Sequence, residues 1–163
     1  MVGILFVCMG NICRSPMAEG VFRTRADRAG ILDRLTVDSA GTTDYHAGDA
    51  PDPRGVRTAA QYGVDLSFIR ARKVEVVDFE SFDYILAMDH DNMRNLKNQC
   101  PENHLPRLGY FLEYAADLPL KELPDPYYGG EDGFVRCFDL VERAADGLLA
   151  AILDRHFPDH VRS

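Results

Sequence analysis

A short apolar segment that leads directly into a polar turn and then a helix is the feature that most constrains the fold. Residues 2–7 are almost wholly apolar, which is typical of a strand buried on both faces of a sheet. After the turn, Pro16 opens a stretch with apolar residues at helical spacing, and Gly30 ends it. Because proline is well tolerated at the first helical position, we expect the helix to begin at Pro16.

The rest of the chain repeats this alternation. The further elements that the sequence predicts are a strand at 35–39, a helix at 52–63, a strand at 82–88, a helix at 89–97, an edge strand at 104–108 and a helix at 134–152. Such alternation favours an α/β fold of three layers, with helices on both faces of a parallel sheet. Ligands of these sheets bind beyond the carboxyl ends of the strands, so the turn after the first strand is the expected site.

Two long segments, residues 41–53 and 109–133, are rich in Gly, Pro, Asp and Tyr. Neither divides the chain into parts of domain size, so we expect one domain spanning residues 1–163. Long irregular segments in a compact domain usually carry binding or catalytic residues. We therefore expect both segments to be functional loops.

Charge and composition argue against several classes of function. The formal net charge of −8 disfavours a nucleic-acid or membrane-surface binder, because both partners attract clustered Lys and Arg. No apolar run approaches the roughly 18 residues that span a bilayer, and the first residues lack the pattern of a signal peptide, so we expect a cytoplasmic protein. Four cysteines are few for a disulfide scaffold, and Cys8 and Cys13 lack a second pair of ligands. We expect neither a metal nor a cofactor.

The turn itself carries chemistry, because Cys8 stands six positions before Arg14. The N–H groups of such a turn, the N-terminus of the following helix and the planar guanidinium of Arg14 together form a cradle for a phosphate-like anion. The same field favours the thiolate of Cys8, which is a nucleophile. Gly10 and Asn11 tolerate the positive φ that a loop around an anion requires, and Ser15 is placed to donate a hydrogen bond to the thiolate.

Removal of a phosphate from an alcohol also requires a proton donor for the leaving group. The residues alone leave five candidates open, namely Asp49, Asp52, Asp89, Asp125 and Asp132. Their spacing does not select one of them.

Residues 7–20, VCMGNICRSPMAEG, resemble the signature of the low-molecular-weight protein tyrosine phosphatases. Further segments resemble the family in the same order over nearly the whole chain: VDSAGT at 37–42, PDPR at 51–54, FDYILAMD at 82–89 and LPDPYYG at 123–129. The resemblance implies a four-stranded parallel sheet with a phosphate-binding loop after the first strand. It also implies hydrolysis of phosphotyrosine in protein substrates through a phosphocysteine on Cys8, with Arg14 binding the phosphate.

The resemblance assigns further roles. Asp125 looks like the general acid, which later acts as the base that activates water. Tyr127 and Tyr128 resemble the wall of a slot deep enough for a phenyl phosphate, and Tyr45 and His46 occupy its variable rim. The residues of the turn that complete the phosphate-binding loop are Met9, Gly10, Asn11, Ile12, Cys13 and Ser15.

Support for the loop is implied at two more positions. Ser39 resembles the family residue that braces Asn11 through hydrogen bonds, and Arg72 is expected to support the same region. The family often has a His three residues before this Arg, and here the position holds Ile69. Part of the bracing is therefore expected to be missing.

The nearest alternative is an arsenate reductase on the same fold, which passes electrons through further cysteines. Cys100 and Cys137 are widely separated in sequence, and we expect them to be structural. Cys13 instead matches the family's second loop cysteine, which is able to form a reversible disulfide with Cys8. A phosphotyrosine-binding module without turnover is also disfavoured, because the nucleophile, the arginine and the acid are all present.

Overall fold

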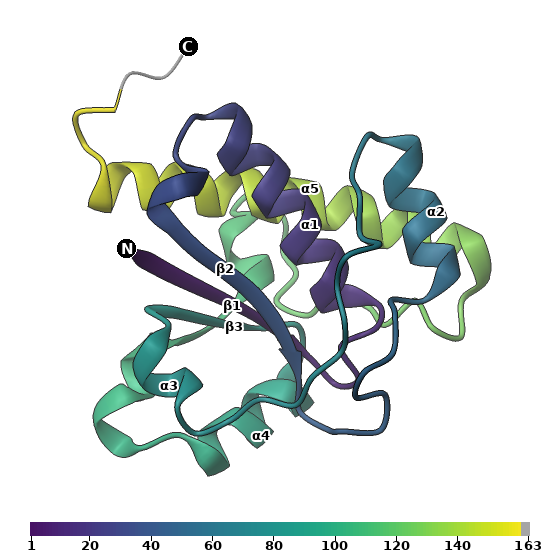
Figure 1. Ribbon diagram of the computed structural model, residues 1–163, viewed down its shortest axis with the longest axis horizontal. Helices are drawn as coiled ribbons and strands as arrows, with labels where there is room; N and C mark the ends of the chain where they lie inside the picture. The colour runs from purple at the N-terminus through teal and green to yellow at the C-terminus, as the bar shows by residue number, and fades with distance from the viewer. Residues whose placement is uncertain (161–163) are drawn as a thin grey trace.

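The computed structural model describes residues 1–160, which contain a four-stranded parallel sheet (Figure 1). The strands stand in the spatial order β2-β1-β3-β4 and comprise β1 (Val2–Cys8), β2 (Leu35–Gly41), β3 (Tyr84–Ala87) and β4 (Leu108–Tyr110). The central strand β1 pairs with β2 along its whole length, from Val2 opposite Leu35 to Cys8 opposite Gly41. The predicted α/β fold with a four-stranded parallel sheet is confirmed.

Helices cover both faces of this sheet. They are α1 (Arg14–Arg28), α2 (Pro53–Gln61), α3 (Asp78–Ser81), α4 (His90–Gln99) and α5 (Gly130–His156), with short 3-10 helices η1 (Leu32–Arg34), η2 (Glu102–Arg107) and η3 (Phe111–Tyr114). Figure 1 shows α1 and α5 on one face and α3 and α4 on the other. The helix α2 packs beside α5 at the same face.

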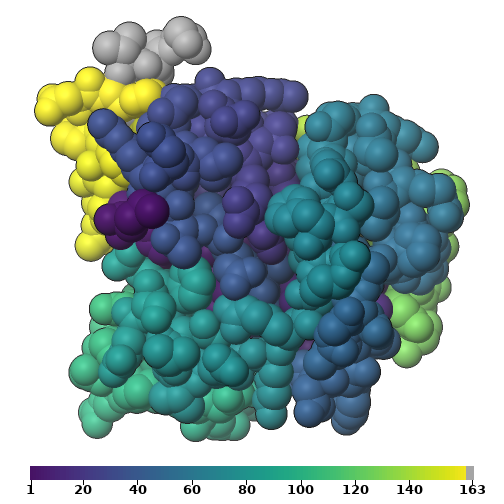
Figure 2. Space-filling view, viewed as in Figure 1, coloured from purple at the N-terminus to yellow at the C-terminus, as the bar shows by residue number. Residues whose placement is uncertain are grey.

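The side chains of β1 enter two separate cores in alternation. Ile4 and Phe6 belong to the core beneath α1 and α5, whereas Leu5 and Val7 belong to the core beneath α3 and α4. All four are fully buried, which explains the unbroken apolar run in the sequence. In the space-filling view, the N-terminal end of the chain reaches the surface at the left, and atoms of other segments cover the sheet (Figure 2).

Several predicted boundaries differ from the structure: the last helix, predicted at 134–152, is α5 (Gly130–His156), and two further differences have a clear physical reason. The helix α1 begins at Arg14 rather than at Pro16, so the proline is the third helical residue and still lies in the first turn, where its missing N–H has no helical partner. The edge strand predicted at 104–108 is the 3-10 helix η2 for most of its length, and β4 begins only at Leu108. Pro106 cannot donate to a sheet ladder, which explains why pairing starts beyond it.

The two predicted loops have different outcomes. Residues 42–52 contain neither helix nor strand, as expected. The segment 109–133 is irregular only between η3 and α5, because it begins inside β4 and ends inside α5. The short helix α3 was not predicted. Within residues 1–160, no helix combines the length and the apolar composition needed to cross a membrane.

Gly147 of α5 lies close to the backbone of Tyr114 in η3. A Cβ added at Gly147 would overlap the carbonyl oxygen of Tyr114. We expect Gly147→Ala to lower the free energy of unfolding by about 1–3 kcal/mol, although alanine is the better helix former. Urea unfolding measures the change. The control is Gly133→Ala in the same helix, where the nearest atoms to an added Cβ lie at 3.6 Å. Equal stability of the two variants would contradict this account.

Candidate active site

The turn between β1 and α1 lies at the carboxyl end of the central strand. Its carbonyl groups are engaged outside the turn, because those of Cys8, Met9 and Ile12 accept hydrogen bonds of 2.8–3.1 Å from N–H groups of the segment 42–52. The concave side of the turn is therefore left to N–H groups, which is the arrangement of an anion-binding loop. The N-terminus of α1 adds partial positive charge at the same place.

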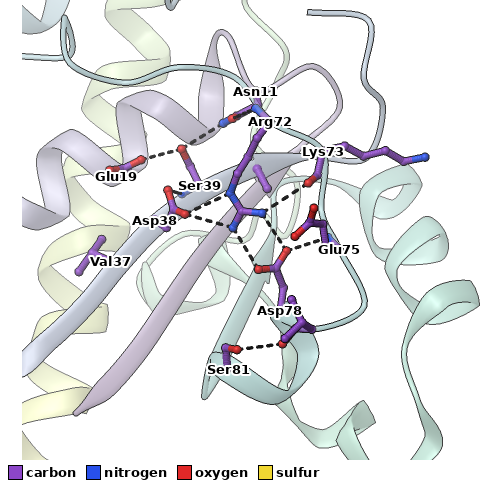
Figure 3. A network of polar contacts seen from close by, with 12 residues as sticks. Asn11, Glu19, Val37, Asp38, Ser39, Arg72, Lys73, Glu75, Asp78 and Ser81 are labelled. Atoms are coloured by element: carbon purple, nitrogen blue, oxygen red, sulfur yellow. Dashed lines mark hydrogen bonds and ion pairs between the residues drawn. The ribbon is translucent and has the colours of Figure 1, made fainter. Parts of the chain in front are cut away.

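Asn11 fixes the shape of this loop. Its φ is +57°, in the left-handed region, and its side chain is almost fully buried. The amide nitrogen donates to Ser15 Oγ at 2.8 Å. It also donates to Ser39 Oγ at 3.0 Å (Figure 3), and the amide oxygen accepts from the Arg72 N–H at 3.1 Å. These three bonds hold a backbone conformation that is unfavourable for most residues.

The remaining support comes from an ion cluster around Arg72. Its guanidinium bonds Asp38 at 3.1 Å and Asp78 at 2.9 Å, so it ties β2 to α3 while its N–H holds Asn11 (Figure 3). Ile69, which stands where the resemblance led us to expect a His, is buried in the apolar core. Asn11 keeps three hydrogen-bond partners beside this substitution.

Cys8 lies at the end of β1 with its Sγ 2.9 Å from Ser15 Oγ. The thiol is nearly buried but forms part of a surface pocket. Cys13, further along the loop, also reaches the pocket, and burial raises the pKa of its thiol, as do the nearby Asp52 and Cys8. The four cysteines are free thiols in the structure.

Arg14 is buried behind the loop and meets three partners. It donates to Asp89 Oδ2 at 2.8 Å and to the Leu123 carbonyl at 3.0 Å, and its other terminal nitrogen lies 3.7 Å from Asp125 Oδ2. Burial acts to lower the pKa of Arg14, but Cys8, Asp89 and Asp125 outweigh it and the pKa is raised. The guanidinium therefore stays charged in its buried position.

The pocket above the loop gathers most of the residues that the sequence singled out. Its lining consists of Cys8, Met9, Gly10, Ile12, Cys13, Arg14, Thr43, Tyr45, His46, Asp125, Tyr127 and Tyr128. Of these, Thr43 was missed, although it lies only two residues beyond the end of β2 at Gly41. Asn11 and Ser15 brace the loop from behind rather than line the pocket, and Ser39 and Arg72 lie one step further away.

Aromatic side chains form the walls. The rings of Tyr127 and Tyr128 meet edge to face at 4.9 Å, and the guanidinium of Arg54 lies 5.5 Å from the Tyr127 ring. Across the pocket, Tyr45 is largely exposed. His46 packs against Gly10 and places Nδ1 3.3 Å from Asp49 Oδ2. Aromatic side chains therefore contribute much of the pocket lining.

The structure separates the five candidate acids. Asp125 lines the pocket, and its Oδ1 accepts from the Tyr127 N–H at 3.1 Å. Asp52 caps α2 and pairs with Arg54, whose hydrogen bonds lower the pKa of this carboxyl. Asp89 caps α4 with one oxygen and binds Arg14 with the other. Asp49 is not part of the pocket lining and contacts His46, and Asp132 lies in the exposed first turn of α5. Among residues 1–160, no group of three His, Cys, Asp or Glu side chains could hold a metal ion.

Comparison with known proteins gives consistent matches. Residues 3–157 match the family model "Low molecular weight phosphotyrosine protein phosphatase". A protein of that name from Schizosaccharomyces pombe is 46% identical, over 84% of this chain and 88% of its own length. A protein tyrosine phosphatase from Entamoeba histolytica, solved with Hepes in its active site, superposes with a TM-score of 0.91 at 38% identity, covering 94% and 98% of the two chains. Vibrio vulnificus Wzb, solved with benzylphosphonate, gives 0.80 at 27% identity, covering 92% and 98%.

A cysteine and an arginine on the loop after a central strand, taken with these matches, define a phosphatase of the hydrolase class. The chain belongs to the family of low molecular weight phosphotyrosine protein phosphatases. The resemblance seen in the sequence is thereby confirmed.

Asn11 provides a test of how the loop is held. Asn11→Ala and Asn11→Gly both lose three hydrogen bonds, and we expect both to lower kcat/KM by about 10²-fold, because the loop loses its geometry. Glycine tolerates positive φ, so Asn11→Gly should be about 1 kcal/mol more stable than Asn11→Ala in urea unfolding. Full activity of the glycine variant would show that the backbone conformation alone holds the loop.

Proposed function

We propose that this phosphatase hydrolyses phosphotyrosine in proteins through a phosphocysteine on Cys8, with Arg14 binding the phosphate and Asp125 transferring protons. The observation that carries the proposal is the meeting of these three side chains in one pocket, although they come from distant parts of the chain. The three side chains supply a nucleophile, a cation for the phosphate and a proton donor, which are the groups that the proposed reaction requires. We also propose that residues 1–163 form a single phosphatase domain.

The phosphate would lie in the loop between Cys8 and Arg14. Backbone N–H groups on the concave side, the N-terminus of α1 and the guanidinium all favour an anion with several oxygens. Binding of benzylphosphonate by the similar protein Wzb supports a phosphate-like ligand at this position. We propose that the loop residues Met9, Gly10, Ile12 and Cys13 contact the ligand, whereas Asn11 and Ser15 hold the loop in shape.

The first chemical step forms the bond from Cys8 Sγ to phosphorus while the bond from phosphorus to the phenolic oxygen breaks. Asp125, in its acid form, gives its proton to the leaving oxygen, and the tyrosine departs neutral. In the second step, the Asp125 carboxylate takes a proton from water as the water oxygen attacks phosphorus. The S–P bond breaks, inorganic phosphate leaves, and the thiolate and the protonated Asp125 are restored.

The walls favour an aryl phosphate. Tyr127 and Tyr128 on one side and Tyr45 and His46 on the other offer surface for a phenyl ring. We propose that the pocket is deep enough for a phenyl group to bring its phosphate to the thiolate, and too deep for the shorter phosphoserine. We therefore propose tyrosine-phosphorylated proteins as substrates, with no role for nucleic acid or membrane. Four free thiols suit the reducing cytoplasm, where we propose that the enzyme acts.

Replacing the nucleophile tests the covalent route. We expect Cys8→Ser to abolish measurable turnover of a chromogenic phenyl phosphate while the urea unfolding transition is kept, because an alcohol is a weak nucleophile here. Cys100→Ser, which changes a thiol outside the pocket, is the matched control and should keep wild-type turnover. Turnover by Cys8→Ser within about tenfold of wild type would rule out the phosphocysteine. Thiol oxidation dependent on arsenate, without phenyl phosphate turnover, would instead indicate an arsenate reductase.

Proton transfer by Asp125 is tested by the choice of leaving group. Asp125→Asn should slow phosphotyrosine hydrolysis by about 10²- to 10⁴-fold, because the phenolate of tyrosine needs a proton. An activated nitrophenyl phosphate needs it less and should be slowed far less. Asp132→Asn, in the first turn of α5, is the control and should leave both rates unchanged. Equal losses with both leaving groups would show that Asp125 only shapes its loop.

A further inference from the structure

One buried carboxylate near the site has no part in the chemistry described so far. Glu19 lies on α1, and its side chain is 3% exposed. Its Oε1 accepts a hydrogen bond from Ser39 Oγ at 2.7 Å, and its Oε2 accepts from Arg23 Nε at 3.0 Å. Figure 3 shows Glu19, Ser39 and Asn11 joined in one line of hydrogen bonds. A buried carboxylate at the end of such a line controls which way the hydrogens point.

The direction of each bond follows from Asn11. Its amide oxygen accepts from the Arg72 N–H, so both hydrogens of its nitrogen are donated, one to Ser39 and one to Ser15. Ser39 Oγ therefore accepts from Asn11 and must give its own proton elsewhere. The carboxylate of Glu19 accepts this hydrogen bond.

The same argument holds at the other end of the line. Ser15 Oγ accepts from Asn11, which leaves its own proton free. Two acceptors are within reach, namely Cys8 Sγ at 2.9 Å and the Ala40 carbonyl at 3.5 Å. The sulfur is closer, and a thiolate is the stronger acceptor because it carries charge. The hydroxyl of Ser15 thus stabilises the charged nucleophile.

We propose that Glu19 is a positioning residue: through Ser39 and Asn11, its carboxylate orients the Ser15 hydroxyl as a donor to the Cys8 thiolate. This inference rests on the proposed function, in which Cys8 reacts as the thiolate. If Glu19 became a donor, the Ser39 hydroxyl would lose the acceptor of its proton, and that proton would then oppose the N–H that Asn11 donates. The Arg72 N–H would still hold the amide oxygen, but the amide nitrogen would be displaced from its two serine partners. Ser15 would then lose the partner that fixes its hydroxyl.

The groups around Glu19 act on its pKa in opposite directions. Burial raises the pKa of Glu19, as does nearby Asp38, whereas the hydrogen bonds from Ser39 and Arg23 lower it; the net direction is upward. Arg23 is the cation that faces the carboxylate, and it is itself held by the Val37 carbonyl at 2.7 Å. The ion pair thus supports the acceptor role of Glu19.

The test is Glu19→Gln, which keeps shape and size but can donate to Ser39. We expect the rate of Cys8 alkylation by iodoacetamide, followed at the Cys8 peptide by mass spectrometry, to reach half its maximum about one pH unit higher than in wild type. We also expect kcat/KM at neutral pH to fall by about tenfold. Glu142→Gln removes the charge from another glutamate that pairs with an arginine of α1, and should change neither value.

A merely structural role gives a different result, because glutamine fills the same space. Lower stability in urea with an unchanged alkylation profile would overturn the proposal. Should Glu19→Gln fail to fold, Ser39→Ala interrupts the same line and should shift the alkylation profile in the same direction. An unshifted profile in Ser39→Ala would equally overturn it. The alkylation profile follows the thiol and not turnover, so failure of the proposed function would be seen separately, as turnover by Cys8→Ser.

A double variant with Ser15 tests whether Glu19 acts on Cys8 through the Ser15 hydroxyl. In a Ser15→Ala background the donor to Cys8 is already absent, so Glu19→Gln should add no further shift to the alkylation profile. The same shift in both backgrounds would show that Glu19 affects Cys8 by another route, and the positioning role would be wrong.

Discussion

The left-handed backbone at Asn11, held by its buried side chain, is the constraint on which the rest of the site depends. An unfavourable conformation persists only where its surroundings fix it, and here three segments do so. The partners of Asn11 belong to the start of α1, the end of β2 and the stretch at Arg72. The curvature of the loop is therefore a property of the folded sheet and not of the loop sequence alone.

The main charge interactions of the site involve Arg14. Its cation is buried among Cys8, Asp89 and Asp125, so three acidic groups share one positive charge. An isolated buried charge would be costly, and these partners offset the cost. A chain with net charge −8 can still offer a site for an anion, because the loop N–H groups, the N-terminus of α1 and the Arg14 guanidinium lie together at the pocket.

What the sequence predicts well is what is local. The strand at β1, the cysteine and arginine of the turn, and the helix after it lie within one continuous stretch, so pattern and spacing were sufficient. The ion cluster of Arg72 with Asp38 and Asp78 was invisible, because its members come from separate segments joined only by the fold. The edge strand was misplaced because Pro106 blocks pairing where the apolar pattern suggested it. Residue patterns alone could not select Asp125 among five acids; that choice came from the family resemblance.

Asp89 links the N-terminus of α4 to Arg14 at the pocket. One oxygen accepts from the Asn92 N–H and so closes the first turn of α4, and the other holds Arg14 at the base of the pocket. A free-energy coupling between two contacts of one group acts in both directions. Whatever tightens the hold of Arg14 on Asp89 must equally stabilise the beginning of α4, and fraying of that helix end must loosen the arginine. The pocket and a surface helix on the far side of the sheet from α1 therefore share one thermodynamic link.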